Sequence, residues 1–344
     1  MLFVLFTLLT AAVTAALLTG VVRHFVLARG LLDVPNERSS HVVPTARGGG
    51  IAIVAVVLAV AALSLWTGGA DTRLALGLLL GGALVAGIGF LDDRGHVSAP
   101  LRLLVHFVAL GGALAAIGGL PAVTWGDGRV DLGLAGDVLA CVAGVWFLNL
   151  FNFMDGIDGI AASEAAFVAF AAAWLAGTTG APAWLITLWL VTGGASLGFL
   201  LWNWPPARIF MGDVGSGFLG FVLPLLLVYS TGHSGLNLWT ALILGAPFVA
   251  DATVTLVARI ARGERWYSAH RSHAYQWLSR RWGSHARVTG LFILVNVGLV
   301  LPAAWWTVLW PQHGPLAASL VLVTLGVAAR AAGAGRPEAV ASRN

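Results

Sequence analysis

The chain has 344 residues, of which 58% are hydrophobic and only 10% are charged, and its mean hydropathy is +0.88. A soluble domain carries roughly 25% charged residues, so this composition excludes a large soluble domain and indicates a protein that crosses a membrane many times. The formal net charge is +4, but all 19 basic residues are arginines gathered in a few loops, which argues against a nucleic-acid partner. The single cysteine, Cys141, excludes an intrachain disulfide.

Apolar runs long enough to span a bilayer, about 17–22 residues each, recur along the chain. The first has no basic residue before it and is followed by Arg23, the reverse of a signal peptide, so we expect its N-terminus outside. The predicted spans are residues 2–22, 49–67, 74–91, 103–120, 134–151, 160–178, 183–202, 214–231, 237–258, 288–309 and 313–330. We therefore predict an all-α polytopic membrane protein of about eleven (10–11) helices. One transmembrane domain covers residues 1–330, and a disordered tail follows over 331–344.

The arginines divide unevenly between the two sides of this topology. Seventeen of the 19 fall on one side, and only Arg73 and Arg129 fall on the other. The positive-inside rule makes the first side, and with it the C-terminus, cytoplasmic. The polar loops of that side lie near residues 31–50, 92–102, 149–159, 203–213 and 259–287. On the opposite side, Gly126-Asp127-Gly128 predicts a small β-hairpin within residues 123–131.

The fifth span ends in a run with a polar residue at every third position: Asn149, Asn152, Asp155 and Asp158. Residues three apart share one face of a helix, so the run predicts a polar stripe at a helix end. The alternative is an ordinary polar turn. Amide and carboxylate oxygens are the ligands that a hard cation such as Mg²⁺ prefers.

Further acids occur at the ends of other spans. Asp92 and Asp93 end the third span, where a solvated helix end is the alternative, and Asp213 opens the eighth within G-D-V-G-S. A helix N-cap explains such an aspartate as well as a functional role does, and a glycine-rich helix start can also bind phosphate. Asp251 lies within the ninth span and must face the bundle or a cavity, with no partner predicted.

Two cytoplasmic loops carry basic residues. His270, Arg271 and His273 lie in the longest loop, without a Cys or Glu at metal-site spacing, so contact with phosphate fits better than zinc. Attraction of anionic lipid is the alternative. The loop before the second span contains Arg38, His41 and Arg47, for which loop anchoring and substrate contact are equally favoured. Acids that converge repel one another and repel a phosphate. A divalent cation with flanking arginines resolves that conflict and suggests phosphoryl transfer to a lipid.

This ordered set of motifs resembles the polyprenyl-phosphate N-acetylhexosamine-1-phosphate transferases. That superfamily includes the muramoyl-pentapeptide transferase of peptidoglycan synthesis and the UDP-GlcNAc:undecaprenyl-phosphate transferases of O-antigen and teichoic-acid assembly. The match runs from Asp33 to His273, through the Asp-Asp pair, N-x-x-N-x-x-D-G-x-D-G, G-D-x-G-S and the histidine loop. The resemblance implies a ten- or eleven-helix enzyme of the bacterial inner membrane with a cytoplasmic active site. It also implies transfer from a UDP-N-acetylhexosamine to undecaprenyl phosphate with release of UMP, and a homodimer is a further expectation.

The resemblance also implies roles for individual residues. Asn152 and Asp213 would hold Mg²⁺, with Mn²⁺ as the alternative. Asp92 resembles the base that deprotonates the lipid phosphate, a covalent role being the alternative, and Asp93 would support it. The remaining implied catalytic residues are His270, Arg271 and His273. The implied substrate contacts are Asn149, Asp155, Asp158, Arg102, Arg38, His41 and Arg47, with Asp158 the nearest match to a uracil contact.

Departures from the family patterns favour one branch. Pentapeptide transferases carry consecutive histidines and a lysine-rich approach to the second span, whereas this chain has His270-Arg-Ser-His273 and no lysine. We therefore expect an enzyme that begins O-antigen or another surface glycan with GlcNAc or a deoxy relative such as FucNAc or QuiNAc. The pentapeptide transferase and a teichoic-acid homologue remain alternatives. A transporter is the non-enzyme alternative, although its acids should lie near the bilayer midplane. A CDP-alcohol phosphotransferase is disfavoured because its arginine and downstream acid pair are missing after Gly159.

Overall fold

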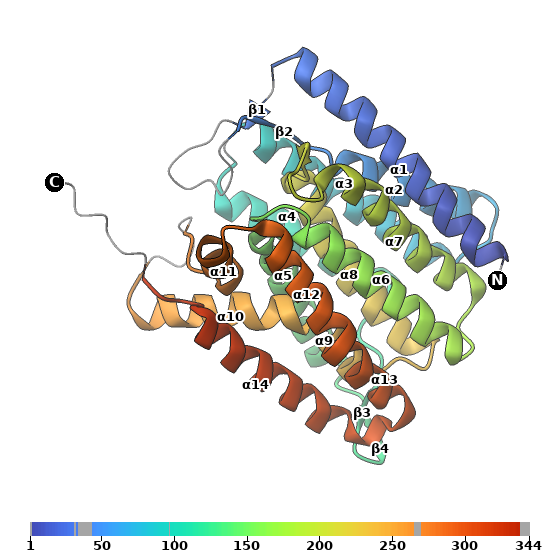
Figure 1. Cartoon of the computed structure of the whole chain (residues 1–344). Coiled ribbons are helices and arrows are strands. Elements are labelled where there is room, and N and C mark those ends of the chain that lie inside the picture. The colour runs from blue at the N-terminus through green and yellow to red at the C-terminus, as the bar shows by residue number, and fades with distance from the viewer. Residues whose placement is uncertain (1, 31, 34–42, 96, 265–269, 338–344) are drawn as a thin grey trace.

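The computed structural model describes residues 2–30, 32–33, 43–95, 97–264 and 270–337. Over these residues the chain is almost wholly helical, and most helices run side by side along one direction (Figure 1). The α-helices are α1 (Leu2–Ala28), α2 (Ile51–Trp66), α3 (Thr72–Arg94), α4 (Ala99–Ile117), α5 (Gly133–Met154), α6 (Ile160–Thr178), α7 (Ala183–Asn203), α8 (Asp213–His233), α9 (Leu238–Leu244), α10 (Ala246–Ala261), α11 (Ala274–Trp282), α12 (His285–Val295), α13 (Leu301–Leu309) and α14 (Gly314–Ala332). A π-helical segment, η1 (Asn296–Val300), joins α12 to α13, and the 3₁₀ turn η2 (Pro311–His313) precedes α14.

The helices make this a multi-pass membrane protein. Nine helical segments of the described chain are long and apolar enough to span a membrane, and a tenth is added if α9 and α10, bent by 72°, form one span. The remaining apolar helix, α2, has 16 residues. At about 1.5 Å per residue it is shorter than the roughly 30 Å of a bilayer core. Every predicted apolar run is thus helical, but the number of about eleven spans is not confirmed, and the outside position of the N-terminus stays a prediction.

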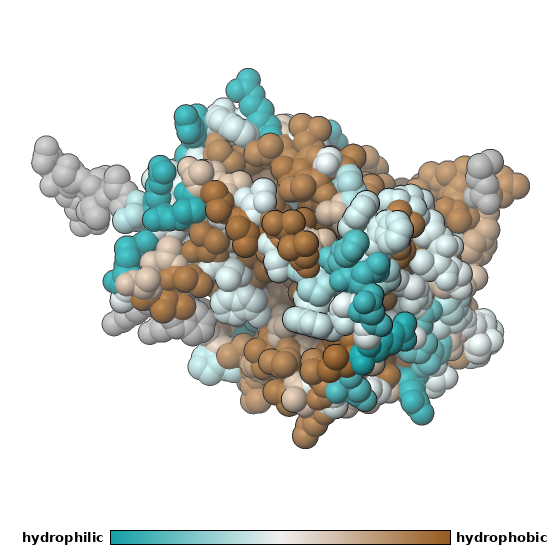
Figure 2. Space-filling model, turned by 90° about the horizontal axis from the view of Figure 1, so that it is seen from below, coloured by the Kyte–Doolittle hydropathy of each residue, from teal (hydrophilic) through white to brown (hydrophobic). Residues whose placement is uncertain are grey.

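Burial distinguishes central helices from peripheral ones. The apolar stretch of α8 is 83% buried and that of α6 is 78% buried, whereas those of α1 and α14 are only 17% buried. Outer helices expose large apolar side chains such as Phe6, Leu134 and Leu316. Apolar groups likewise cover much of the face in Figure 2, with hydrophilic groups between them. An apolar exterior around buried central helices suits a lipid environment, where backbone groups must be satisfied within helices.

Short strands mark the two ends of the helical body. β1 (Leu32–Asp33), β2 (Thr45–Arg47) and β5 (Ile209–Phe210) form one sheet, in which β2 pairs antiparallel with β1 and parallel with β5. β3 (Val123–Trp125) and β4 (Gly128–Val130) form an antiparallel hairpin, which confirms the hairpin predicted for this loop. Figure 1 shows β1, β2 and α11 at one end of the molecule, and the N-terminus and the hairpin at the other.

The C-terminal segment differs from the prediction. Beyond α14, Gly333, Ala334 and Gly335 are buried, and the Gly335 N–H donates to the carbonyl oxygen of Ser272 at 2.8 Å. Within the tail that was predicted to start at residue 331, α14 thus continues to Ala332, and Gly333–Gly335 pack against a loop some sixty residues away. Residues 338–344 lie outside the described part of the chain.

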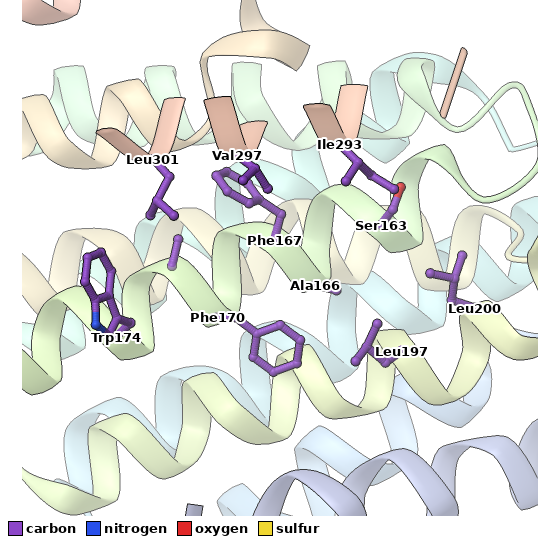
Figure 3. A pocket seen from close by; sticks show the side chains of 11 residues that line it. Ser163, Ala166, Phe167, Phe170, Trp174, Leu197, Leu200, Ile293, Val297 and Leu301 are labelled. Carbon is purple, nitrogen blue, oxygen red and sulfur yellow. The ribbon is translucent and has the colours of Figure 1, made fainter. Parts of the chain in front are cut away.

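An apolar pocket of about 370 Å³ lies between α6, α7 and the α12–α13 segment. Figure 3 shows Phe167, Phe170 and Trp174 of α6 along it, with Leu197 of α7 on one side and Val297 on the other. The pocket has almost no polar lining, so it offers nothing for the binding of a nucleotide or a phosphate.

Candidate active site

The end of α3 and the start of α8 meet through Asp93. Its Oδ1 accepts the backbone N–H of Asp213 at 2.9 Å, and its Oδ2 accepts that of Val214 at 3.1 Å. A carboxylate at this position satisfies two free donors of the helix start and opposes the positive end of the helix dipole. Gly212 permits the approach: its φ is +77°, and an added Cβ would lie 2.5 Å from Asp93 Oδ2. The sequence thus brings two acids that are 120 residues apart into one cluster.

Two arginines bind this acid cluster. Arg47 contacts Asp93 (Nε to Oδ1, 2.8 Å) and Asp213 (Nη2 to Oδ1, 2.7 Å). Arg102 Nη1 lies 2.5 Å from Asp92 Oδ2 and 3.4 Å from Asp213 Oδ2. Asp213 is therefore held between two guanidinium groups. The remaining oxygen of Asp92 accepts the N–H of Val97 at 2.9 Å.

The small sheet places Arg47. In the parallel pairing of β2 with β5, Arg47 lies opposite Phe210, three residues before Asp213. The N–H groups of Gly48 and Gly49 then donate to the carbonyl oxygen of Phe210 at 3.1 and 2.9 Å. Burial acts to lower the pKa of Arg47, but the carboxylates of Asp213 and Asp93 outweigh it and raise that pKa above its ordinary value. The guanidinium is thus a permanent cation of the cluster.

The two asparagines of the predicted polar stripe at the end of α5 contact different helices, α8 and α4. The Nδ2 of Asn152 donates to Ser216 Oγ in the first turn of α8 at 2.9 Å. The Nδ2 of Asn149 donates to Val145 O at 2.8 Å, and its amide also faces the buried His106 of α4. Asn152 therefore belongs to the surroundings of the acid cluster, whereas Asn149 contacts α4.

Asp155 ends α5 in a negative environment. Burial raises the pKa of its carboxyl well above the ordinary value, and the neighbouring carboxylate of Asp213 raises it further, against the opposing effect of Arg47. These electrostatic interactions place Asp155 beside the acid cluster. A cation bound there would relieve this accumulated negative charge.

Asp158 is engaged by protein groups. Its Oδ2 accepts the N–H of Ala207 at 3.1 Å and lies 3.2 Å from Nδ1 of His285 in α12. Its carbonyl oxygen accepts the hydroxyl of Thr289 at 2.9 Å. The residue thus ties the loop after α5 to the loop before β5 and to α12.

The histidine loop leads into α11, a helix that the sequence analysis did not predict. Asp251 of α10 accepts the N–H of Ala274 at 2.8 Å through Oδ1 and that of Tyr275 at 3.0 Å through Oδ2. The Nδ1 of His273 lies 3.5 Å from the same carboxylate. Asp251, whose partner was not predicted, is therefore the acid that fixes the start of α11.

The two predicted histidines differ in exposure. His273 is only 2% exposed and packs its ring on that of Tyr275, whereas His270 is half-buried, with Nδ1 3.0 Å from Ser272 Oγ. Burial lowers the pKa of His270 to about 3, with His273 and Arg259 acting in the same direction. At neutral pH His270 is therefore uncharged and can act only as a neutral hydrogen-bond donor or acceptor. The positive charge of this loop comes from Arg271, which is also half-buried.

Tyr275 joins the histidine loop to the polar run of α5. Its hydroxyl donates to Phe153 O at 2.9 Å, and a Cβ added to Gly156 would lie 2.1 Å from the Tyr275 oxygen. Gly156 is therefore the residue that lets α11 approach the end of α5. Through this contact the histidine loop, Asp155 and the acid cluster belong to one end of the molecule.

A pocket of about 700 Å³ opens beside the cluster. Its walls combine three arginines with apolar residues of α1, α2 and α3, and two aspartates also line it: Arg29, Arg47, Arg94, Asp33 and Asp93. Arg47 contacts Asp93, so Arg29 and Arg94 add positive charge beyond that ion pair. This mixture of cationic and apolar groups suits an anion carried on an apolar chain. Arg38 and His41, predicted substrate contacts, lie outside the described residues.

The donor set decides which metal the site suits. Asp92, Asp93, Asp213 and Asn152 offer carboxylate and amide oxygens, which fit a hard cation such as Mg²⁺ rather than zinc or copper. Among the described residues, no three His, Cys, Asp or Glu side chains form a ready metal cage. Arginines lie against both oxygens of Asp213, so a cation there would share that carboxylate with them.

Sequence reasoning missed four contributors to this region. His106 of α4 faces Asn149 of α5, and His285 of α12 faces Asp158. Contacts between different helices of this kind cannot be predicted from a local sequence pattern. Tyr275 stands directly after the histidine motif. The fourth, Glu164, is buried in α6 and accepts the Nδ2 of Asn296 at 2.6 Å. Glu164 could have been identified from the sequence, because a carboxylate inside the predicted span 160–178 is unusual.

Comparisons with known proteins identify the family. The glycosyl transferase family 4 model matches residues 75–231, which include the acid cluster and the polar run. The "Probable undecaprenyl-phosphate N-acetylglucosaminyl 1-phosphate transferase" of Bacillus subtilis is 30% identical over 276 residues, 78% of this chain and 75% of that protein. The chain belongs to this family of polyprenyl-phosphate N-acetylhexosamine-1-phosphate transferases.

Two other relatives show the breadth of the family. The decaprenyl-phosphate N-acetylglucosaminephosphotransferase of Mycobacterium tuberculosis is 30% identical over 357 residues, 93% of this chain and 86% of that protein. The phospho-N-acetylmuramoyl-pentapeptide-transferase of Moorella thermoacetica is 34% identical over 188 residues, only 50% of this chain and 57% of that protein. The resemblance inferred from the motifs is confirmed, and the chain is a transferase of this family.

Proposed function

We propose that this chain transfers N-acetylhexosamine-1-phosphate from a UDP-sugar to undecaprenyl phosphate. An oxygen of the lipid phosphate attacks the β-phosphorus, the bond from that phosphorus to the bridging oxygen breaks, and UMP leaves with the bridging oxygen. The observation that carries the proposal is the cluster of Asp92, Asp93 and Asp213 bound by Arg47 and Arg102, in a chain of this family. Little covalent chemistry is required of the protein in such a transfer, so positioning and charge stabilisation dominate.

In this proposal the site residues have different chemical roles. Asn152 and Asp213 would hold Mg²⁺, or Mn²⁺ in its place, which when bound neutralises charge on the diphosphate. Asp92 takes the proton of the lipid phosphate, and Asp93 holds the start of α8 in place. His270 and Arg271 donate to phosphate oxygens from the histidine loop. The nucleotide contacts are assigned to Asn149, Asp155 and Asp158, and further phosphate contacts to Arg38, His41, Arg47 and Arg102.

The sugar and the pathway are part of the proposal. Relatives named for N-acetylglucosamine match 78–93% of this chain, whereas the pentapeptide transferase of Moorella thermoacetica matches 50%. This difference supports GlcNAc over the peptidoglycan substrate, while FucNAc and QuiNAc stay alternatives to GlcNAc. The product would begin an O-antigen or another surface polysaccharide.

The proposed location is the bacterial inner membrane with the site facing the cytoplasm. The arginine asymmetry supports this orientation, since seventeen of the 19 arginines lie on the side of the site in the predicted topology. A water-soluble UDP-sugar would then reach the acid cluster from the cytoplasm while the lipid phosphate arrives from the bilayer. A homodimer is proposed as the assembly.

The test is UMP release by the purified protein in detergent, with undecaprenyl phosphate and a panel of UDP-sugars. We expect turnover with UDP-GlcNAc that requires a divalent cation and falls by at least about 100-fold in Asp213→Asn. Asp71→Asn is the matched control, because Asp71 caps the far end of α3. No UMP from any UDP-sugar, or equal turnover in the two variants, would overturn the proposal.

A transporter is the alternative from another class. A transporter should have acids within its spans, and Asp251, which the sequence places within a span, accepts two backbone N–H groups of α11 in a structural contact. The transporter alternative predicts uptake into proteoliposomes without UMP release, so the same preparation tests both.

A further inference from the structure

The chain returns to the histidine loop after its last helix. We call Gly333, Ala334 and Gly335 the C-terminal strap. All three residues are buried, although they follow the last helix of the described chain. Gly333 ends α14 with φ of +119°, and the Ala334 N–H donates back to Ala329 O at 2.9 Å. The strap thus leaves α14 in a defined direction rather than fraying from it.

The strap is hydrogen-bonded to the loop that carries His270. The Gly335 N–H donates to Ser272 O at 2.8 Å, and the guanidinium of Arg262 donates to the carbonyl oxygen of Gly335. The Oγ of Ser272 lies 3.0 Å from Nδ1 of His270. One residue, Ser272, therefore contacts the strap through its backbone and His270 through its side chain.

Steric fit makes the contact specific. Gly335 has φ of +70°, and an added Cβ would lie 2.4 Å from the Cβ of Ala258. A Cβ on Gly333 would lie 2.9 Å from Cγ of Trp277. Ala334 is fully buried and packs with Ala274 and Ala329. The strap therefore packs against α10, α11 and α14 at once, and the left-handed backbone of Gly335 favours glycine there.

We propose that the strap is a positioning element for His270 and Arg271 in the transfer reaction, an inference that rests on the proposed function. Asp251 fixes the start of α11 on one side of the histidine loop. The strap fixes Ser272 on the other side by supplying the donor that its buried carbonyl oxygen requires. Without the strap, the stretch from His270 to Ser272 loses this anchor and opens locally while the helical body stays folded.

Truncation separates this role from general stability. Deletion of residues 333–344 removes the strap, whereas deletion of residues 338–344 keeps every contact described above and is the matched control. We expect the longer deletion to lower kcat/KM for the UDP-sugar by at least about tenfold relative to the control, while the Tm in detergent changes by no more than about 3 °C. Equal kcat/KM in the two deletions, or a loss of activity that follows a fall in Tm, would overturn the proposal.

A second variant covers the case in which the longer deletion fails to fold. Gly335→Ala forces a Cβ against Ala258 without shortening the chain, so it should displace the strap and lower kcat/KM. Adding Ala258→Gly makes room for that Cβ and should restore part of the loss. No loss in the single variant would contradict the steric argument.

A labelling experiment tests whether the strap holds the histidine loop without measuring turnover. Cys141 is the single cysteine, so Arg271→Cys in a Cys141→Ser background gives one reactive thiol in the histidine loop. We expect maleimide to label position 271 at least about tenfold faster after deletion of residues 333–344 than after deletion of 338–344. Equal labelling rates in the two deletions would overturn the proposal that the strap holds the histidine loop. If the wild-type chain releases no UMP, the proposed function fails, and the labelling rates alone decide whether the strap holds the loop.

Discussion

Replacement of Asp251 by alanine should free the histidine loop without unfolding the helical body. The carboxylate is 2% exposed and accepts the N–H groups of Ala274 and Tyr275, so the variant leaves two buried donors without a partner. Each unsatisfied buried donor costs about 1–3 kcal/mol, so the two donors together cost about 2–6 kcal/mol at the start of α11. A loss of 2 kcal/mol corresponds to a roughly 30-fold increase in local opening. Asp251→Asn keeps one acceptor oxygen and should lose about half as much.

Hydrogen–deuterium exchange and UMP release together measure this effect. Exchange at residues 274 and 275 should rise in Asp251→Ala, and turnover should fall, because His270 and Arg271 precede the freed helix start. Asp71→Ala is the matched control: Asp71 accepts the N–H groups of Arg73 and Leu74 at the opposite end of α3. Unchanged exchange at 274 and 275, or an equal loss of turnover in the control, would refute the reasoning.

Three further predictions concern the end of α5. Asn152→Ala should lower divalent-cation-dependent UMP release by at least about 100-fold, and near-normal turnover would contradict its assignment as a metal ligand. Gly156→Ala should lower turnover about 10- to 100-fold, since its Cβ would lie 2.1 Å from the Tyr275 oxygen. Adding Tyr275→Phe, which removes that oxygen, should restore part of the loss. Finally, the raised pKa of Asp155 means that its ionisation destabilises the folded state as pH rises above the ordinary value of 3.8. Asp155→Asn should therefore raise the Tm at pH 7, and the gain should vanish near about pH 4; a gain independent of pH would exclude this cause.

Hydropathy predicts the helices of this chain well because the signal is local. Each apolar run becomes a helix, since a bilayer leaves the backbone few other ways to satisfy its hydrogen bonds. The convergence of Asp92, Asp93 and Asp213 could also be predicted, because carboxylates are costly inside a bilayer and therefore mark the ends of spans on one side. The hairpin at residues 123–131 followed from turn residues alone.

Contacts between distant segments could not be predicted in this way. The bend between α9 and α10, the helix α11 and the strap each depend on partners far away in the sequence. Gly335 and Ser272, for example, are 63 positions apart, and the sequence around either residue does not predict their hydrogen bond. For the same reason Asp251 was recognised as a buried acid that needs a partner, while the partner itself, a helix start in a polar loop, was missed.

Four acids at this end of the molecule are held in two different ways. Asp93 and Asp251 each accept two successive backbone N–H groups at the start of another helix, α8 and α11. The positive end of the helix dipole favours a carboxylate at such a position, so each of these two acids fixes a helix start. Asp213 and Asp92 cap no helix in this way and are held by Arg47 and Arg102, although Arg47 also contacts Asp93. These arginine side chains can move, so they can release a carboxylate to an arriving cation or turn toward an arriving phosphate. The helix-capping acids therefore set the geometry, and we expect Asp92 and Asp213 to be the acids that exchange partners during a reaction.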